Sequence, residues 1–379
     1  AEQSMDENLN WAANESGDVK VTSEEFTRGW FSSEGQHRIE LQDGDLLTAL
    51  QALAGPISAC DLPVFIINTR LDHGLIPVTS MARDKGSLAP GLGSAVSTMQ
   101  VELPDGEIID VPGTIYSEVT LGGQLHSNYV LDSGSRDKDG VSASWGSVDI
   151  NVATDPQTGT VEYDGSVASL SFTADQDSMS LDALSFEGRR VPTRFDVAIG
   201  DLDFALEGLA LGNAMGGGFR ASRLAVTGSS SLDGDRLDSK ARVSATNDVP
   251  GLGPVSYELD LSLDGVDAAS MGALQAKVTE MNTAPEPMAV YASIEPDVQR
   301  LFAAGFDFNI KRLEITLPQG TMTSVMRFSL GEGDPATFDW SSLLLDTEAS
   351  LDISIPVDMV EAVAAFHEKH RFRERGGEE

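Results

Sequence analysis

Apolar and polar residues alternate with a period of two over much of the chain after residue 145. The clearest case is residues 256–264, in which every second position is apolar: Tyr257, Leu259, Leu261 and Leu263. The same alternation occurs in residues 194–200, 312–318 and 349–357. Successive side chains of a strand point to opposite faces of its sheet, so each segment predicts a strand with one apolar face and one acidic face.

Asp-Gly pairs, which favour tight hairpin turns, punctuate the alternating segments. They stand at four places: Asp139-Gly140, Asp164-Gly165, Asp233-Gly234 and Asp264-Gly265. The chain has 37 glycines and 6% aromatic residues, which is typical of a folded protein rich in turns. We therefore predict a mainly β fold: a long curved antiparallel sheet, built as a meander of hairpins, with a few helices that cover part of it.

Helix signals are few. Helical spacing or helix-end residues mark four segments: residues 43–55, 267–282, 295–305 and 356–375. The chain has 379 residues, more than the roughly 250 to 300 at which a single core stops growing. The polar segment 133–140 is the expected boundary, so we predict an N-terminal α+β region, residues 1–140, and an antiparallel β region with a C-terminal helix, residues 141–379.

The charge balance is strongly acidic. Sixty Asp and Glu residues against 25 Lys and Arg give a formal net charge of -35. Such a field repels polyanions, so nucleic acid is excluded as a partner and anionic lipid headgroups are poor partners. The acids are dispersed along the chain, which is typical of a surface adapted to high salt and predicts a halophilic source.

Membrane and disulfide signals are weak. No run of 18 apolar residues occurs, so we expect no segment of this chain to span a membrane. The only cysteine, Cys60, cannot form an internal disulfide and stands among apolar residues, which favours a buried, inert thiol. The chain begins at Ala1 with a polar stretch, and we expect a processed or truncated N-terminus.

Motifs for catalysis or cofactor binding are missing. Neither the phosphate-binding pattern G-x-x-x-x-G-K-[ST] nor the nucleophile pattern G-x-S-x-G occurs. His367 and His370 fit a solvated helix face, and His37 and His126 have no spaced partner. Carboxylate clusters at 233–238 and 175–177 lack the calcium-binding spacing and fit hairpin turns. We predict no metal, no cofactor and no catalytic residue.

The segment Asp72-His73-Gly74 is the one histidine motif that needs an interpretation. It follows an apolar run, residues 64–67, which predicts a buried strand, and Pro77 limits how far that strand continues. Gly74 permits a bend, and Asp72 can orient the His73 ring. We interpret the motif as a structural corner, and a hydrolase that uses His73 with Asp72 is the less favoured alternative.

Three stretches resemble, in order and context, the YdgA-type family of bacterial envelope proteins, whose function is not established. They are EFTRGWFSSEGQ at residues 25–36, LDHGLIP at 71–77 and IPVDM at 355–359. The family pattern falls on Arg28, Gly29, Phe31, Ser32 and Ser33, and on His73 and Gly74. The family usually has proline after the His-Gly pair, whereas this chain has Leu75. The resemblance implies a periplasmic domain whose N-terminal anchoring segment is not part of this sequence, and structural roles for the motif residues.

The repeated acidic hairpins are also similar in architecture to AsmA-like envelope proteins, whose curved sheets handle lipids. Our leading hypothesis is a non-enzymatic periplasmic binding or scaffold protein that holds a lipid-like or other apolar ligand on its curved sheet. Met179, Met322 and Met326 would suit such a lining. The alternative is a homodimeric assembly module in which two copies cover each other's apolar faces.

Overall fold

The structure is a computed structural model of the chain. It describes residues 19–29, 32–42, 62, 64–73, 91–104, 106–138, 140–174, 177–212, 218–249, 251–283, 287–335, 338–343 and 347–375. These residues form eighteen strands and a few helices, and the strands pair antiparallel in an open hairpin meander. The mainly β fold predicted from the period-two pattern is therefore confirmed.

Two compact units divide the chain. Unit 1 comprises residues 1–132 and 147–161, and unit 2 comprises residues 133–146 and 162–379. Residues 133–140, which we expected to mark a boundary, thus belong to a short hairpin of unit 2. The chain returns to unit 1 at residue 147.

The strands of unit 1 pair antiparallel in the order β1-β2-β3-β4-β5-β6-β9. They are β1 (Val19–Arg28), β2 (Ser32–Leu41), β3 (Val64–His73), β4 (Gly91–Glu102), β5 (Ile108–Thr120), β6 (Leu125–Leu131) and β9 (Val148–Asp155). They form a meander in which each strand up to β6 pairs with the next one along the chain. The helix predicted at residues 43–55 lies outside the described residues, as does Cys60.

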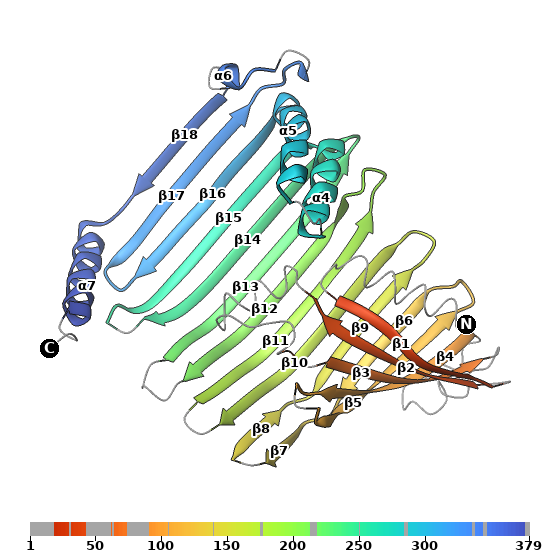
Figure 1. Ribbon diagram of the computed structural model, residues 1–379. Helices are drawn as coiled ribbons and strands as arrows, with labels where there is room; N and C mark the ends of the chain where they lie inside the picture. Colours follow the sequence, from red (N-terminus) through yellow and green to blue (C-terminus); the bar gives the residue numbers. More distant parts are fainter. Residues whose placement is uncertain are drawn as a thin grey trace. The chain divides into compact units, whose positions relative to one another are not determined.

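The strands of unit 2 are also antiparallel, and those from β10 onward follow chain order (Figure 1). They start with β7 (Gly134–Lys138) and β8 (Val141–Trp145), and β8 pairs with β10 (Thr160–Ala174). The next strands are β11 (Asp177–Pro192), β12 (Ala198–Gly212), β13 (Gly218–Asp233), β14 (Arg236–Val249) and β15 (Gly253–Asp267). The last are β16 (Phe306–Leu317), β17 (Gly320–Leu330) and β18 (Thr347–Ser354).

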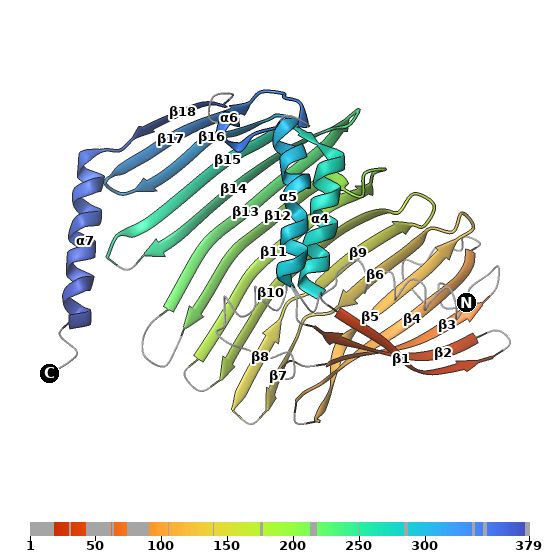
Figure 2. The same ribbon diagram turned by 45° about the horizontal axis from the view of Figure 1, so that its top comes forward.

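Helices of unit 2 occur in three places. α4 (Ala268–Thr283) and α5 (Pro287–Ala303) form a hairpin inserted between β15 and β16, α6 (Trp340–Leu343) is one turn, and α7 (Val357–Arg375) follows β18. Figure 2 shows α4 and α5 side by side on one face of the sheet. The predicted helices at 267–282 and 356–375 are confirmed, and the one at 295–305 is the second half of α5.

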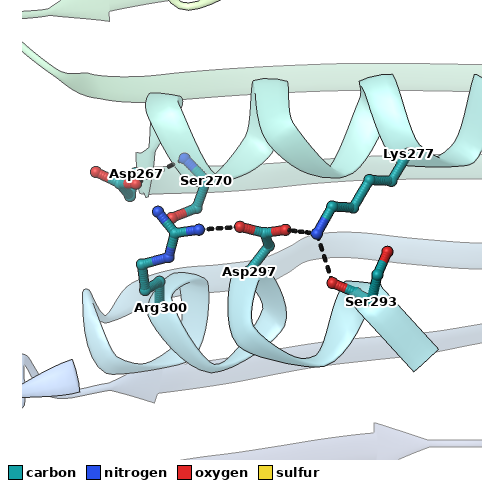
Figure 3. A network of polar contacts seen from close by, with 6 residues as sticks. All are labelled: Asp267, Ser270, Lys277, Ser293, Asp297 and Arg300. Atoms are coloured by element: carbon teal, nitrogen blue, oxygen red, sulfur yellow. Dashed lines mark hydrogen bonds and ion pairs between the residues drawn. The ribbon is translucent and has the colours of Figure 1, made fainter. Parts of the chain in front are cut away.

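A buried carboxylate joins α4 to α5 (Figure 3). The Asp297 side chain, on α5, is only 3% exposed and forms ion pairs with Lys277 of α4 and Arg300 of α5. Asp267 Oδ1 accepts a hydrogen bond of 2.8 Å from the Ser270 amide, which caps the start of α4. A buried charge is tolerated only when it is paired, so this network holds the two helices in one arrangement.

Three local predictions from the sequence were wrong. Residues 194–196, predicted as part of a strand, form the turn between β11 and β12, because Asp196 has a φ of 58°. Asp164-Gly165 lies within β10 rather than in a turn. Asp264-Gly265 lies within β15, where Gly265 has a φ of 76° beside a register shift against β14, which is typical of a β-bulge.

Candidate functional site

The Arg-Gly part of the sequence motif forms the hairpin turn between β1 and β2. The Gly29 amide donates a hydrogen bond of 2.7 Å to the Ser32 carbonyl, and Arg28 lies opposite Ser33. A Cβ atom at position 29 would lie 2.5 Å from the Ser32 carbonyl oxygen, so only glycine fits without a shift of the backbone. Phe31 lies outside the described residues.

The Asp72-His73 pair belongs to β3 and ends it. Asp72 is buried and lies opposite Ser32 of β2 and Ser94 of β4, while position 73 lies opposite Gly93. The Arg70 Nε atom is 3.6 Å from Asp72 Oδ1. Consecutive strand positions belong to opposite faces, so positions 72 and 73 do not face each other. Gly74 lies outside the described residues. That the chain is not an enzyme stays a prediction.

His37 has no role predicted from the sequence, yet this residue of β2 is only 2% exposed. Its Nδ1 atom is 3.0 Å from the Ser23 hydroxyl of β1. Beside it, the Thr69 and Ser97 hydroxyls of β3 and β4 share a buried hydrogen bond of 2.8 Å. Each partner is at least 14 residues away in the chain, so only the strand register could reveal these pairs. His126 is exposed on β6, and His367 lies in α7.

One face of the unit 2 sheet carries two adjacent rows of apolar residues that cross the strands from β11 to β18. Directly paired positions share a face, so the rows follow from the strand registers. Apart from Ser324, one row is apolar: Phe186, Phe204, Val226, Val243, Leu259, Leu313, Ser324 and Ile353. The other contains only apolar residues and glycine: Gly188, Leu202, Gly228, Ala241, Leu261, Ile310, Met326 and Leu351. We call these two rows the apolar band.

Helices cover both ends of the face that carries the apolar band. At one end Ala268 and Met271 of α4 and Leu301 of α5 pack into a cluster that includes Leu263 of β15. At the other end Met359 of α7 packs against Val255 and Leu317. Met322 of β17 also joins this second cluster. The clusters hold much of the buried apolar surface of unit 2 and leave the band between them.

No apolar side chain of the band is fully buried. Leu202, Leu351 and Ile353 are 37%, 59% and 56% exposed, and the other apolar residues of the band are half-buried by their neighbours in the sheet. A sheet with an apolar face normally buries that face against another layer. The described residues of unit 2 supply such a layer only at the two ends.

The opposite face of the same sheet is charged. Arg242 pairs with Asp260 at 2.9 Å, and Arg312 pairs with Glu258 at 2.7 Å and with Glu314 at 2.9 Å. The hydrogen bond that Arg312 donates to Glu314 and the charge of Glu258 raise the pKa of Arg312 above its ordinary value. The one apolar and one acidic face predicted for each strand are therefore present, and the charged face is suited to water.

Comparison with known proteins gives one match, to a family model described as "Bacterial protein of unknown function (DUF945)", over residues 1–375. The chain belongs to this family. No curated protein and no solved structure matches the chain. Family membership therefore indicates a bacterial protein but assigns no activity to the site.

Within the described ranges, no three His, Cys, Asp or Glu side chains come together in a way that could hold a metal ion. None of the helices that the structure describes is both long and apolar enough to cross a membrane.

Proposed function

We propose that this DUF945 protein is a non-enzymatic binding protein of the bacterial periplasm that holds a lipid-like or other apolar ligand on the apolar band of unit 2. The observation that supports the proposal is the band itself: two apolar rows across eight strands, half-exposed between two helix-covered ends. The periplasmic location is supported by the resemblance to YdgA-type envelope proteins. The likeness to AsmA-like proteins agrees with a lipid as ligand.

The dimensions of the band suit an acyl chain. Neighbouring strands are about 4.8 Å apart, so eight strands span roughly 34 Å. One leaflet of a membrane is roughly half of a hydrocarbon core that is about 30 Å thick. A fatty acyl chain laid across the strands would thus fit within the band. Each 100 Å² of apolar surface that it covered would contribute roughly 2.5 kcal/mol.

The charge of the protein narrows the class of ligand. A formal net charge of -35 disfavours ligands with several negative charges. We therefore expect a neutral or zwitterionic lipid, or a single-chain fatty acid, rather than a polyanionic glycolipid. Met326 lies in the band, and a thioether side chain adapts to ligands of different shape.

The first experiment is native mass spectrometry of the protein purified from its own host, followed by organic extraction and identification of the co-purifying molecules. A lipid at close to one molecule per chain is the expected result. A protein that is free of apolar molecules and does not bind the fluorescent fatty acid cis-parinaric acid would contradict the proposal.

A matched pair of variants tests the position of the ligand. Val226 and Thr227 are neighbours in β13, and Val226 belongs to the band while Thr227 is exposed on the charged face opposite Arg242. We expect Val226→Glu to weaken binding of cis-parinaric acid at least tenfold and Thr227→Glu to leave it unchanged. Equal effects of both substitutions would place the ligand elsewhere.

Homodimeric assembly is the second candidate, and β18 favours it. Within the described chain this strand pairs only with β17, so its other edge has free backbone groups. Leu351 and Ile353 of β18 are 59% and 56% exposed, and Ile355, which follows the strand, is 47% exposed. Light scattering over a hundredfold range of concentration tests this candidate. A constant monomer mass would eliminate it, and a dimer that Ile353→Lys dissociates would support it.

A further inference from the structure

A polar cleft of about 420 Å³ lies on the sheet of unit 1, across β1 to β4. The registers place its main lining residues in two neighbouring rows on one face of the sheet. One row consists of Glu25, Gln36, Asn68 and Thr98. The other consists of Thr27, Glu34, Arg70 and Val96. All of these residues belong to unit 1, whereas the residues of the apolar band belong to unit 2.

A ladder of side-chain amides crosses the floor of the cleft and continues beyond it. Gln36 Nε2 donates to Asn68 Oδ1 at 2.8 Å, and Asn68 Nδ2 donates to Gln100 Oε1 at 3.1 Å. Gln100 Nε2 then donates to Asp110 Oδ1 at 2.7 Å. The ladder joins β2, β3, β4 and β5, and it fixes the side chains of Gln36 and Asn68 before any ligand arrives.

Chemistry sets the direction of this ladder. An ionised carboxylate only accepts hydrogen bonds, so Asp110 requires the NH₂ group of Gln100 to face it. The oxygen of Gln100 must then face the NH₂ group of Asn68, and the oxygen of Asn68 must face the NH₂ group of Gln36. Among the described residues, no donor bonds the amide oxygen of Gln36 at the head of the ladder, so this oxygen can accept from a ligand. Asn68 uses one of its two amide hydrogens in the ladder and keeps the second.

The charged groups of the cleft add acceptors on one side and a donor on the other. Glu25 lies directly opposite Gln36, and Glu34 lies between Thr27 and Arg70. The Arg70 side chain is 62% exposed and adds a fork of N–H donors. Two carboxylates against one guanidinium leave the cleft with an excess of negative charge and of hydrogen-bond acceptors.

From this arrangement we propose that the cleft binds a neutral saccharide. Each sugar hydroxyl both donates and accepts a hydrogen bond, which matches a site with fixed amides, carboxylates and one guanidinium. The two carboxylates disfavour an anionic ligand, and an apolar ligand would leave the remaining hydrogen-bonding capacity of the amides and carboxylates unused. The volume is within the range of about 300 to 1,000 Å³ that is typical of small-molecule sites. One or two sugar rings would occupy it.

The experiment is a microarray of neutral and acidic oligosaccharides probed with the whole chain, followed by calorimetric titration of the best neutral binder. Asn68→Leu removes two bonds of the ladder at nearly constant volume, and Glu25→Gln removes one exposed carboxylate without changing its size. Asn151→Leu on β9 is the matched control, because Asn151 lies outside the cleft. Melting curves of all variants identify any variant that fails to fold. If Asn68→Leu fails to fold, Glu25→Gln still tests the proposal.

We expect at least a tenfold loss of saccharide affinity in Asn68→Leu and Glu25→Gln, with wild-type affinity in Asn151→Leu. The proposal is overturned if no neutral oligosaccharide binds at millimolar concentration. It is also overturned if the variants bind the sugar as well as the wild type, or if the cleft takes only the cationic polyamine spermidine. Binding of cis-parinaric acid to unit 2 is measured on the same samples, so the failure of one proposal is distinguishable from the failure of the other.

Discussion

Substitution of Gly272 by alanine tests how closely α4 approaches the turn between β11 and β12. An added Cβ atom at this position would lie 1.8 Å from the backbone oxygen of Phe195. An ordinary contact for such an atom is about 3.4 Å or more, so the helix or the turn must move by roughly 1.6 Å. The obstacle is a backbone atom, which no rotamer change can remove. The movement would loosen the cluster of Val197, Leu237 and Val266 beneath the helix.

Two opposing terms decide the size of the effect. Alanine is favoured over glycine inside a helix by about 1 kcal/mol. Overpacking a well-packed core costs about 1 to 3 kcal/mol, and a backbone obstacle places this site at the upper end. We expect Gly272→Ala to lower the free energy of unfolding of unit 2 by roughly 2 kcal/mol. For a unit of this size that corresponds to a fall in Tm of roughly 4 to 8 °C.

The assay is thermal unfolding followed by calorimetry and circular dichroism. Ala276→Gly, at an exposed position of the same helix, measures the helix-propensity term alone and should cost about 1 kcal/mol. If Gly272→Ala proves as stable as the wild type or more stable, α4 does not contact the turn as described, and the reasoning fails.

Four further outcomes are expected. Thr69→Val should cost about 1 to 3 kcal/mol in urea unfolding because it leaves the Ser97 hydroxyl without its partner, and adding Ser97→Ala should restore part of the loss; an additive loss would contradict a direct pair. Asp297→Ala should destabilise unit 2 more than Asp297→Asn does, since only the amide keeps an acceptor for Lys277; equal Tm values would refute the buried network. Burial raises the pKa of Tyr129, so the contribution of its protonated phenol to stability should be complete below pH 10 and be lost as the pH rises through the folded pKa. A Tyr129→Phe variant that loses as much stability above pH 10 as the wild type does would contradict this. The net charge of -35 predicts a Tm that rises between low and molar NaCl, and a flat dependence would contradict the halophilic interpretation.

The alternation of apolar and polar residues predicted most of the fold. Leu259 and Leu261 predicted a one-sided strand, and that strand is β15 with one face in the apolar band. Asp-Gly pairs were less informative because the same dipeptide serves a turn at Asp233-Gly234 and a bulge at Asp264-Gly265. A bulge depends on the register of the neighbouring strand, which local sequence does not contain.

Helix ends and side-chain partners were harder to predict. Pro296 is typical of a helix start, yet it lies in the middle of α5, which begins at Pro287. The polar cleft was missed entirely, since Gln36 and Asn68 stand 32 residues apart and meet only because β2 and β3 pair in one particular register. The described histidines gave little guidance, because the buried one, His37, was among those without a sequence signal.

The pairing of each strand from β11 to β18 with its neighbours in the chain has a consequence for folding and for variation in length. Contacts that are mostly between adjacent hairpins keep the sequence separation short, so the sheet can grow from any hairpin without first closing a long loop. Nearest-neighbour pairing also means that a hairpin can be gained or lost without changing the registers of the others, as in repeat proteins. The insertion of α4 and α5 between β15 and β16, which still pair directly, shows that the connections tolerate additions. Each added hairpin would widen the sheet by about 10 Å. The length of apolar ligand that the sheet can hold would therefore increase with the number of hairpins.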